Sequence, residues 1–147
     1  MKRFILLSIS ALAFLTISVA PAFAGLGLQA GLALDPDMFL IGVHFKSSAV
    51  DKNLYFIPSV EAGFGDDVTM VAGNADLHYV FKTDSKLAPY AGGGLTLNYF
   101  DYDGGDDTDF GGSILGGIQL TPKMFLEVKA GLGDVPDWKF IVGWNRR

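Results

Sequence analysis

Alternation of apolar and polar residues is the feature of this sequence that most constrains its fold. A period of two places successive side chains on opposite faces of a β-strand, and no stretch after residue 24 has a convincing helical period. The alternation recurs in eight segments, which are Leu26–Leu34, Met38–Lys46, Leu54–Gly65, Thr69–Phe81, Leu87–Tyr99, Phe110–Leu120, Met124–Leu132 and Trp138–Trp144. The sequence therefore predicts an all-β fold.

The connections between these segments are mostly short and rich in turn residues. Asp35–Asp37, Asp66–Asp67 and Thr121–Lys123 are examples. Connections of this length join antiparallel neighbours, so we expect an up-and-down meander. The exception is Asp101–Asp109, which we interpret as the one long loop and the only connection long enough to serve as a contact site.

The polar face of the predicted strands is rich in glycine, with about one ionisable residue per strand. A face in bulk water would carry many charged side chains, whereas small residues with a few matched charges suit the lumen of a narrow barrel. The opposite face is apolar over most of its length and suits lipid. We therefore predict an eight-stranded antiparallel up-and-down transmembrane β-barrel, closed so that no strand edge is left unpaired in lipid.

Charge divides the connections into two groups, as expected for a barrel whose two ends face different environments. When the connections are numbered in order along the chain, the odd ones hold Asp35, Asp37, Asp66, Asp67, Asp101, Asp103, Asp106, Asp107 and Asp134, whereas the even ones hold Lys52, Lys82, Lys86 and Lys123. Asp51 and Asp84, which lie in even connections, weaken this division of charge without reversing it.

The first 24 residues have the three parts of a secretory signal peptide. Lys2 and Arg3 precede an apolar run from Phe4 to about Val19, and Ala22-Phe23-Ala24 follows as a cleavage motif. We expect cleavage after Ala24, which leaves residues 25–147 as a single domain. The net charge of −5 argues against nucleic-acid binding, and the absence of cysteine excludes disulfides and thiolate metal sites.

Two glycine-rich stretches carry a resemblance to a known family. Leu87-Ala-Pro-Tyr-Ala-Gly-Gly-Gly-Leu and Phe110-Gly-Gly-Ser-Ile-Leu-Gly-Gly-Ile-Gln-Leu, with the alternation of the whole mature chain, resemble the small outer-membrane β-barrel superfamily. Its members include the transmembrane domain of outer membrane protein A. The chain departs from the family's usual terminal aromatic residue, because Trp144 is followed by Asn145-Arg146-Arg147.

The resemblance implies a monomer in the outer membrane of a Gram-negative bacterium. It implies outer-membrane lipid and lipopolysaccharide as neighbours, insertion by the outer-membrane assembly machinery, and both termini in the periplasm. The acidic connections would then face outward.

Strand parity predicts a polar network inside the barrel. Opposite charges in a narrow lumen should pair, because an isolated buried charge is costly. The residues expected there are His44, Glu61, Asn74, Asp76, His78, Glu127, Lys129 and Lys139. We therefore expect a filled lumen and a structural role in the envelope, without catalysis, metal or cofactor.

Three alternatives remain open. A narrow gated pore could open if a pair such as Glu127 and Lys139 exchanged partners. A lipid A-modifying barrel enzyme would need a histidine beside a serine such as Ser59 or Ser113. A soluble, lipocalin-like periplasmic barrel would turn its apolar face inward around an apolar ligand.

The aspartates of the fifth connection suggest attraction of divalent cations. Their spacing does not match an EF-hand, because Gly104 and Gly105 occupy ligand positions. We expect diffuse attraction of Mg²⁺ or Ca²⁺, which could bridge to lipopolysaccharide, at Asp101, Asp103, Asp106, Asp107 and Asp109.

Overall fold

The computed structural model describes residues 25–47 and 49–145. The predicted signal peptide lies outside the described residues. The described part contains nine antiparallel strands, which are β1 (Leu26–Leu34), β2 (Met38–Phe45), β3 (Ala49–Asp51), β4 (Leu54–Gly65), β5 (Val68–Val80), β6 (Ala88–Tyr102), β7 (Gly105–Gln119), β8 (Met124–Gly133) and β9 (Trp138–Asn145). Within these ranges, no helix has the length and apolar character needed to span a membrane.

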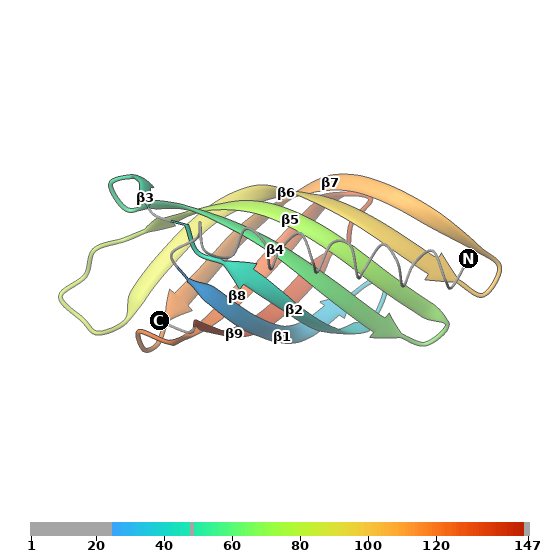
Figure 1. Cartoon of the computed structure of the whole chain (residues 1–147), viewed down its shortest axis with the longest axis horizontal. Helices are drawn as coiled ribbons and strands as arrows, with labels where there is room; N and C mark the ends of the chain where they lie inside the picture. Colours follow the sequence, from blue (N-terminus) through green and yellow to red (C-terminus); the bar gives the residue numbers. More distant parts are fainter. Residues whose placement is uncertain (1–24, 48, 146–147) are drawn as a thin grey trace.

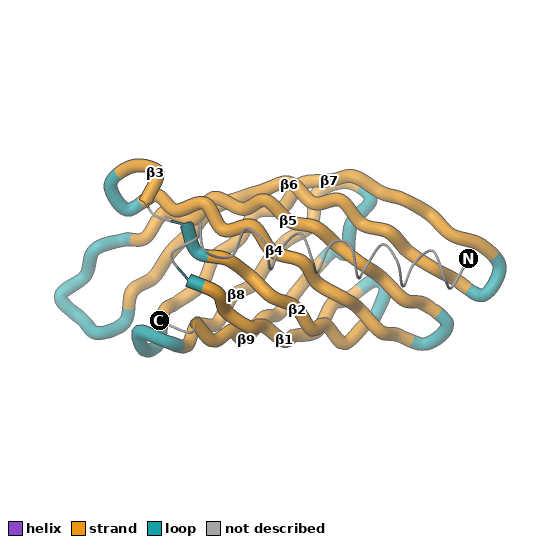
Figure 2. Tube along the Cα trace, viewed as in Figure 1, coloured by secondary structure: helices purple, strands orange, loops and turns teal. Residues whose placement is uncertain are grey.

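Eight of the strands form a closed ring in meander order (Figures 1 and 2). The first and last strands close it, since Gly27 of β1 lies opposite Asn145 of β9. On the other side of β1 the ring continues through β2, whose His44 lies opposite Ser59 of β4. The three-residue β3 pairs only with the start of β4 and is not part of the ring. The predicted eight-stranded antiparallel barrel is thus confirmed.

The connection between β6 and β7 differs from the sequence prediction. The two strands pair as far as Tyr102 and Gly105, which leaves Asp103-Gly104 as the turn. Asp-Gly is a preferred dipeptide of tight hairpins, and the aspartates on either side continue the strands although Asp is generally depleted in strands. The prediction of a long loop from Asp101 to Asp109 was therefore wrong, and the hairpin projects beyond the neighbouring turns (Figure 1).

The outer surface of the ring is an apolar belt. In β5, for example, exposed or half-buried residues alternate with buried ones along the strand. Large apolar side chains exposed on the belt include Leu32, Phe39, Ile41, Leu95, Leu97, Ile114, Leu126 and Phe140. This arrangement is the reverse of a lipocalin-like cup, in which the apolar face would line the interior.

The lumen has an apolar end and a polar end. At the end formed by the acidic connections, a cluster of buried apolar residues fills the interior, comprising Ala33, Met38, Leu40, Val68, Met70, Ala72 and Phe100. We call this cluster the apolar plug. In the connection between β8 and β9 at the same end, Val135 and Pro136 are buried as well. The polar network expected along the lumen therefore occupies only the remaining part of it.

Candidate functional site in the barrel lumen

Every residue that sequence parity assigned to the lumen is buried. His44, Glu61, Asn74, Asp76, His78, Glu127, Lys129 and Lys139 are each at most 7% exposed. Residues two apart on a strand share a face, so β5 contributes Asn74, Asp76 and His78 and β8 contributes Glu127 and Lys129. Seven of these eight side chains fall into two groups of contacting residues, and His44 lies apart from both.

The first group is centred on Glu61, which accepts hydrogen bonds from two other strands. Lys139 Nζ donates to Glu61 Oε1 at 2.8 Å, and Asn74 Nδ2 donates to the same atom at 2.6 Å. Asn74 Nδ2 also lies 3.0 Å from Ser59 Oγ, and Thr96 Oγ1 donates to Asn74 Oδ1 at 2.8 Å. We call these five residues the Glu61 cluster. It links β4, β5, β6 and β9 across the interior.

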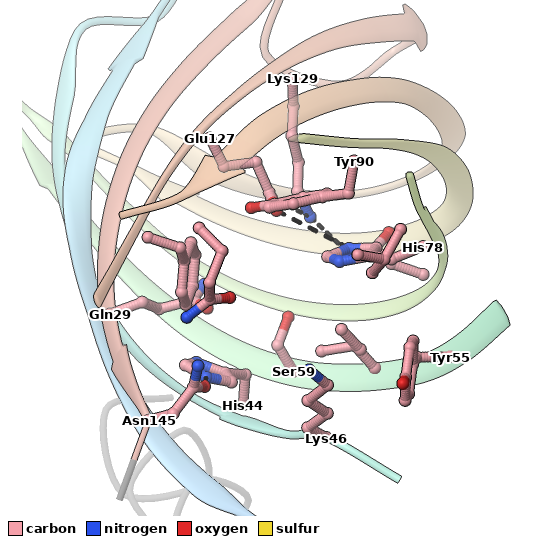
Figure 3. Close-up of a pocket in the computed structure, with 15 residues that line it drawn as sticks. Gln29, His44, Lys46, Tyr55, Ser59, His78, Tyr90, Glu127, Lys129 and Asn145 are labelled. Carbon is pink, nitrogen blue, oxygen red and sulfur yellow. Dashed lines mark hydrogen bonds and ion pairs between the residues drawn. The ribbon is translucent and has the colours of Figure 1, made fainter. Parts of the chain in front are cut away.

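The second group surrounds Glu127, and its main members are drawn in Figure 3. Lys129 Nζ donates a hydrogen bond to Asp76 and lies 3.7 Å from Glu127 Oε1. Tyr90 donates to Glu127 Oε2 at 2.8 Å, and His78 Nε2 is 3.7 Å from that same oxygen. The imidazole of His78 stacks on the Tyr90 ring with centroids 4.8 Å apart. We call Asp76, His78, Tyr90, Glu127 and Lys129 the Glu127 cluster.

The observed partners differ from the pair that a gate would use. Lys139 bonds Glu61, whereas Glu127 is held by Tyr90 and lies beside Lys129. Sequence reasoning did not single out Tyr90 as a site residue, although it shares the parity of the inward Gly92 and Gly94. Parity assigns a face to each residue, and the pairing across the lumen depends on barrel shear, which parity does not supply.

His44 occupies a separate position near the chain end. Its Nε2 donates a hydrogen bond to Asn145 Oδ1 at 2.7 Å, and its ring packs edge-on against Phe125. Both histidines thus lie toward the end of the barrel that bears the lysine-rich connections. Of the two candidate serine nucleophiles, Ser59 bonds Asn74 and Ser113 has no hydrogen-bond partner. Neither is paired with a histidine base.

A cavity of about 40 Å³ lies between the Glu127 cluster and His44. It is large enough for one or a few water molecules. Lys46 is half-buried at this cavity, with its Nζ 4.5 Å from the ring centroid of Tyr55. Several buried polar atoms are without a hydrogen-bond partner, including His44 Nδ1, Glu61 Oε2, Asp76 Oδ1 and His78 Nε2. The lumen therefore has a polar end with room for water and an apolar end.

The five aspartates of the predicted loop are spread along the β6–β7 hairpin. Asp101 lies opposite Asp106, and Asp109 lies opposite Asn98. Tyr99 donates a hydrogen bond to Asp106 Oδ2 at 2.9 Å. Hydrogen bonding and charge repulsion from Asp103 raise the pKa of Asp67 in the neighbouring turn. Among the described residues, the one group of three side chains close enough to hold a metal is instead Asp76, His78 and Glu127.

A closed ring of eight strands with an apolar outer belt and an ion-paired interior is the architecture of small outer-membrane barrels. Solved structures share the barrel fold of this chain. Neisserial surface protein A is 19% identical, with a TM-score of 0.58 over 82% of this chain and 93% of that one. The N-terminal β-barrel domain of Pseudomonas aeruginosa OprF is 19% identical, with a TM-score of 0.61 over 82% and 96%.

The same fold occurs in an enzyme. The outer membrane enzyme PagL is 15% identical to this chain, with a TM-score of 0.54 over 83% of this chain and 98% of that one. No family model and no curated protein matches the sequence. The predicted resemblance to small outer-membrane barrels is thus confirmed as a likeness of fold.

Proposed function

We propose that this chain is a sealed, monomeric outer-membrane barrel with a structural role in the envelope of a Gram-negative bacterium. The filled lumen is the observation that carries this proposal. The apolar plug occupies one end, and the Glu61 and Glu127 clusters cross the rest of the interior. A continuous water path through such an interior would require both buried apolar and ion-paired side chains to separate.

The outer surface supports a membrane location. Exposed leucine, isoleucine and phenylalanine side chains surround the ring. Examples are Leu32, Ile41 and Leu95, which are 55%, 53% and 56% exposed. A continuous apolar belt is unfavourable in water and favourable in hydrocarbon. Insertion by the outer-membrane assembly machinery and removal of residues 1–24 belong to the same proposal.

The acidic end suggests how the barrel contacts the outer leaflet. With the termini in the periplasm, the β6–β7 hairpin and its aspartates face outward beside the phosphates of lipopolysaccharide. Divalent cations shared between these two sets of anions would bridge them, since Mg²⁺ and Ca²⁺ prefer oxygen ligands. A specific test is binding to lipopolysaccharide vesicles with Mg²⁺ and with a chelator. Equal binding in both conditions contradicts the bridge.

The placement of the histidines supports a role without catalysis. His44 and His78 lie toward the lysine-rich end, which the proposed topology places at the periplasm, away from the outer-leaflet lipid A. His44 bonds Asn145 and His78 pairs with Glu127. Ser59 lies opposite His44 in the β2–β4 pair but is hydrogen-bonded to Asn74, so no serine–histidine pair of a hydrolase is formed. We expect an unchanged lipid A mass spectrum in cells that express the protein.

Fractionation and conductance together test the proposal. The protein should occur in the outer-membrane fraction and migrate differently on a gel with and without boiling, as a closed barrel does. After refolding into planar bilayers it should give a silent current trace. A Met70→Ala/Phe100→Ala variant, which removes two large side chains of the apolar plug, serves as the opened control once its gel shift shows that it is folded.

Each outcome has a defined meaning. A silent wild type beside a leaky plug variant supports a barrel that the plug seals. Stepwise currents from the wild type overturn the sealed barrel and favour a gated pore. Recovery of the protein in the soluble periplasmic fraction overturns the membrane location.

A further inference from the structure

Three ligand-type side chains meet beside the lumen cavity. One donor atom from each of Asp76, His78 and Glu127 can be chosen so that all three lie within 4.8 Å of one another. We propose that these residues form an internal binding site for a single divalent transition-metal ion of the Zn²⁺ type. This site goes beyond the proposed structural role and does not depend on it.

Binding of a metal ion requires only small movements of the three side chains. His78 Nε2 and Glu127 Oε2 are 3.7 Å apart. In a tetrahedral site with metal–ligand distances of about 2.0–2.2 Å, neighbouring ligand atoms are separated by roughly 3.3–3.6 Å. Asp76 faces the same point from β5, two residues from His78. The cavity of about 40 Å³ adjoins all three residues and provides room for a water molecule as a fourth ligand.

Two of the three side chains offer buried atoms without a hydrogen-bond partner. Asp76 Oδ1 and His78 Nε2 have no hydrogen-bond partner, although the residues are only 2% and 7% exposed. Buried polar atoms are ordinarily paired. A metal ion between them would supply a partner to both, which makes this placement different from an acidic cluster on the surface.

The charges of the interior also point to a cation. Among the buried residues that the structure describes, three carboxylates (Glu61, Asp76 and Glu127) face two ammonium groups (Lys129 and Lys139). One negative charge is left without a lysine in a region where an isolated charge is costly. A further ammonium at the cavity, that of Lys46, is half-buried and lies over the ring of Tyr55.

The ligands are supported by neighbouring side chains. The Tyr90 hydroxyl donates to Glu127 Oε2, and its ring stacks on the imidazole of His78 with an angle of 11° between the planes. Contacts of this kind fix the orientation of a metal ligand. A mixed imidazole and carboxylate set favours a transition metal over Mg²⁺ or Ca²⁺, which prefer oxygen alone.

Lys129 is the competitor for this position. Its ammonium contacts Asp76 Oδ2, and its positive charge repels a metal ion bound at Oδ1 of the same carboxylate. Glu61 offers an alternative acceptor, because its Oε2 atom is buried without a partner and Lys129 already interacts with it electrostatically. A shift of the ammonium from Asp76 toward Glu61 would therefore keep it beside a carboxylate.

Titration of the purified, refolded protein, prepared without a polyhistidine tag, tests the site. Zn²⁺ is added while heat is recorded, and Co²⁺ is added while its visible absorption reports the ligand geometry. The chain has two histidines, so His44→Gln is a matched control for His78→Gln. We expect one site in the wild type and in His44→Gln, and affinity lower by at least about tenfold in His78→Gln and Glu127→Gln.

A second variant tests the competition. Lys129→Met removes the ammonium that occupies Asp76, so Zn²⁺ affinity should rise severalfold, with the boiling-dependent gel shift as the check on folding. If this variant does not fold, the comparison of the two histidine variants decides the question. The proposal is overturned by the absence of binding up to millimolar Zn²⁺, or by binding that His78→Gln leaves unchanged.

Discussion

Glu61 is the most deeply buried charged residue of the lumen, at 1% exposed, and Lys139 is the cation that pairs with it. We predict that Lys139→Met lowers the free energy of unfolding by about 3–5 kcal/mol, because it leaves a buried carboxylate without its counter-ion. Urea unfolding in detergent micelles measures the loss. Lys123→Met, in an exposed turn, should stay within about 0.5 kcal/mol of the wild type.

A double variant separates the ion pair from simple packing. Glu61→Gln/Lys139→Met removes both charges, so its loss of unfolding free energy should be smaller than that of Lys139→Met alone. The same urea titration provides the comparison. If the double variant lost as much unfolding free energy as Lys139→Met alone, or more, the unpaired charge would not be the cause.

Parity predicts which side chains face the lumen and carries no information on how they pair there. It placed Glu61, Asp76 and Lys139 on the inward faces, where the structure has them. The pair Glu127 and Lys139 was reasonable by proximity along neighbouring strands. Lys139 instead reaches across to β4, because the stagger of a closed barrel brings distant strands to the same height.

The turn between β4 and β5 shows how the acidic end responds to pH. Asp67 there has a left-handed backbone with φ of 59°, which asparagine also tolerates. The pKa of its carboxyl is raised above 3.8 by Asp103. The folded state therefore holds this proton more tightly, so the associated stability is present at low pH and is lost as the pH rises through the raised value.

We predict that Asp67→Asn stabilises the protein at neutral pH and has no such effect below pH 3.8, the usual carboxyl value, where Asp67 is already protonated. Urea unfolding at the two pH values measures the difference. Asp84→Asn, in a turn at the other end of the barrel, is the comparison variant. An equal gain at both pH values would show that charge repulsion is not the reason.

Glycine is required where neighbouring strands approach closely. A Cβ atom added at Gly92 of β6 would collide with the backbone oxygen of Leu77, whereas one added at Gly73 of β5 would meet nothing within 4 Å. We predict that Gly92→Ala costs about 1–3 kcal/mol or more through overpacking. Gly73→Ala should be neutral or stabilising by up to about 1 kcal/mol. The two variants are compared by heating samples before electrophoresis and recording the temperature at which each loses the gel band of the folded, unboiled protein.

Strand positions were predictable from alternation, and the hairpin of β6 and β7 was not. The residues of β1 and β4 match the predicted ranges at both ends. The interpretation of Asp101–Asp109 as a loop rests on its cluster of turn residues, and aspartate is also generally depleted in strands. Extended pairing with the neighbouring strand outweighs that preference here, and the Asp103-Gly104 turn was the signal that could have indicated it.

The apolar belt around the complete barrel predicts a dependence on depth in the bilayer. Leu95 is 56% exposed and lies at the middle of β6, whereas Leu87 lies just before that strand begins. We predict that Leu95→Arg costs about 2–4 kcal/mol in a bilayer and Leu87→Arg about 0–1 kcal/mol. Unfolding from lipid vesicles measures both. Equal, small effects would indicate that water surrounds the belt.

The ion pairs across the lumen also determine how the barrel deforms. Lys139–Glu61 joins β9 to β4, and Lys129–Asp76 joins β8 to β5, so both connect the same two sides of the ring. Under the lateral pressure of a membrane, a barrel cross-linked by parallel ion pairs resists a change of diameter along the direction of those pairs more than at right angles to it. We therefore expect the polar half of this barrel to have one stiff and one compliant cross-sectional axis.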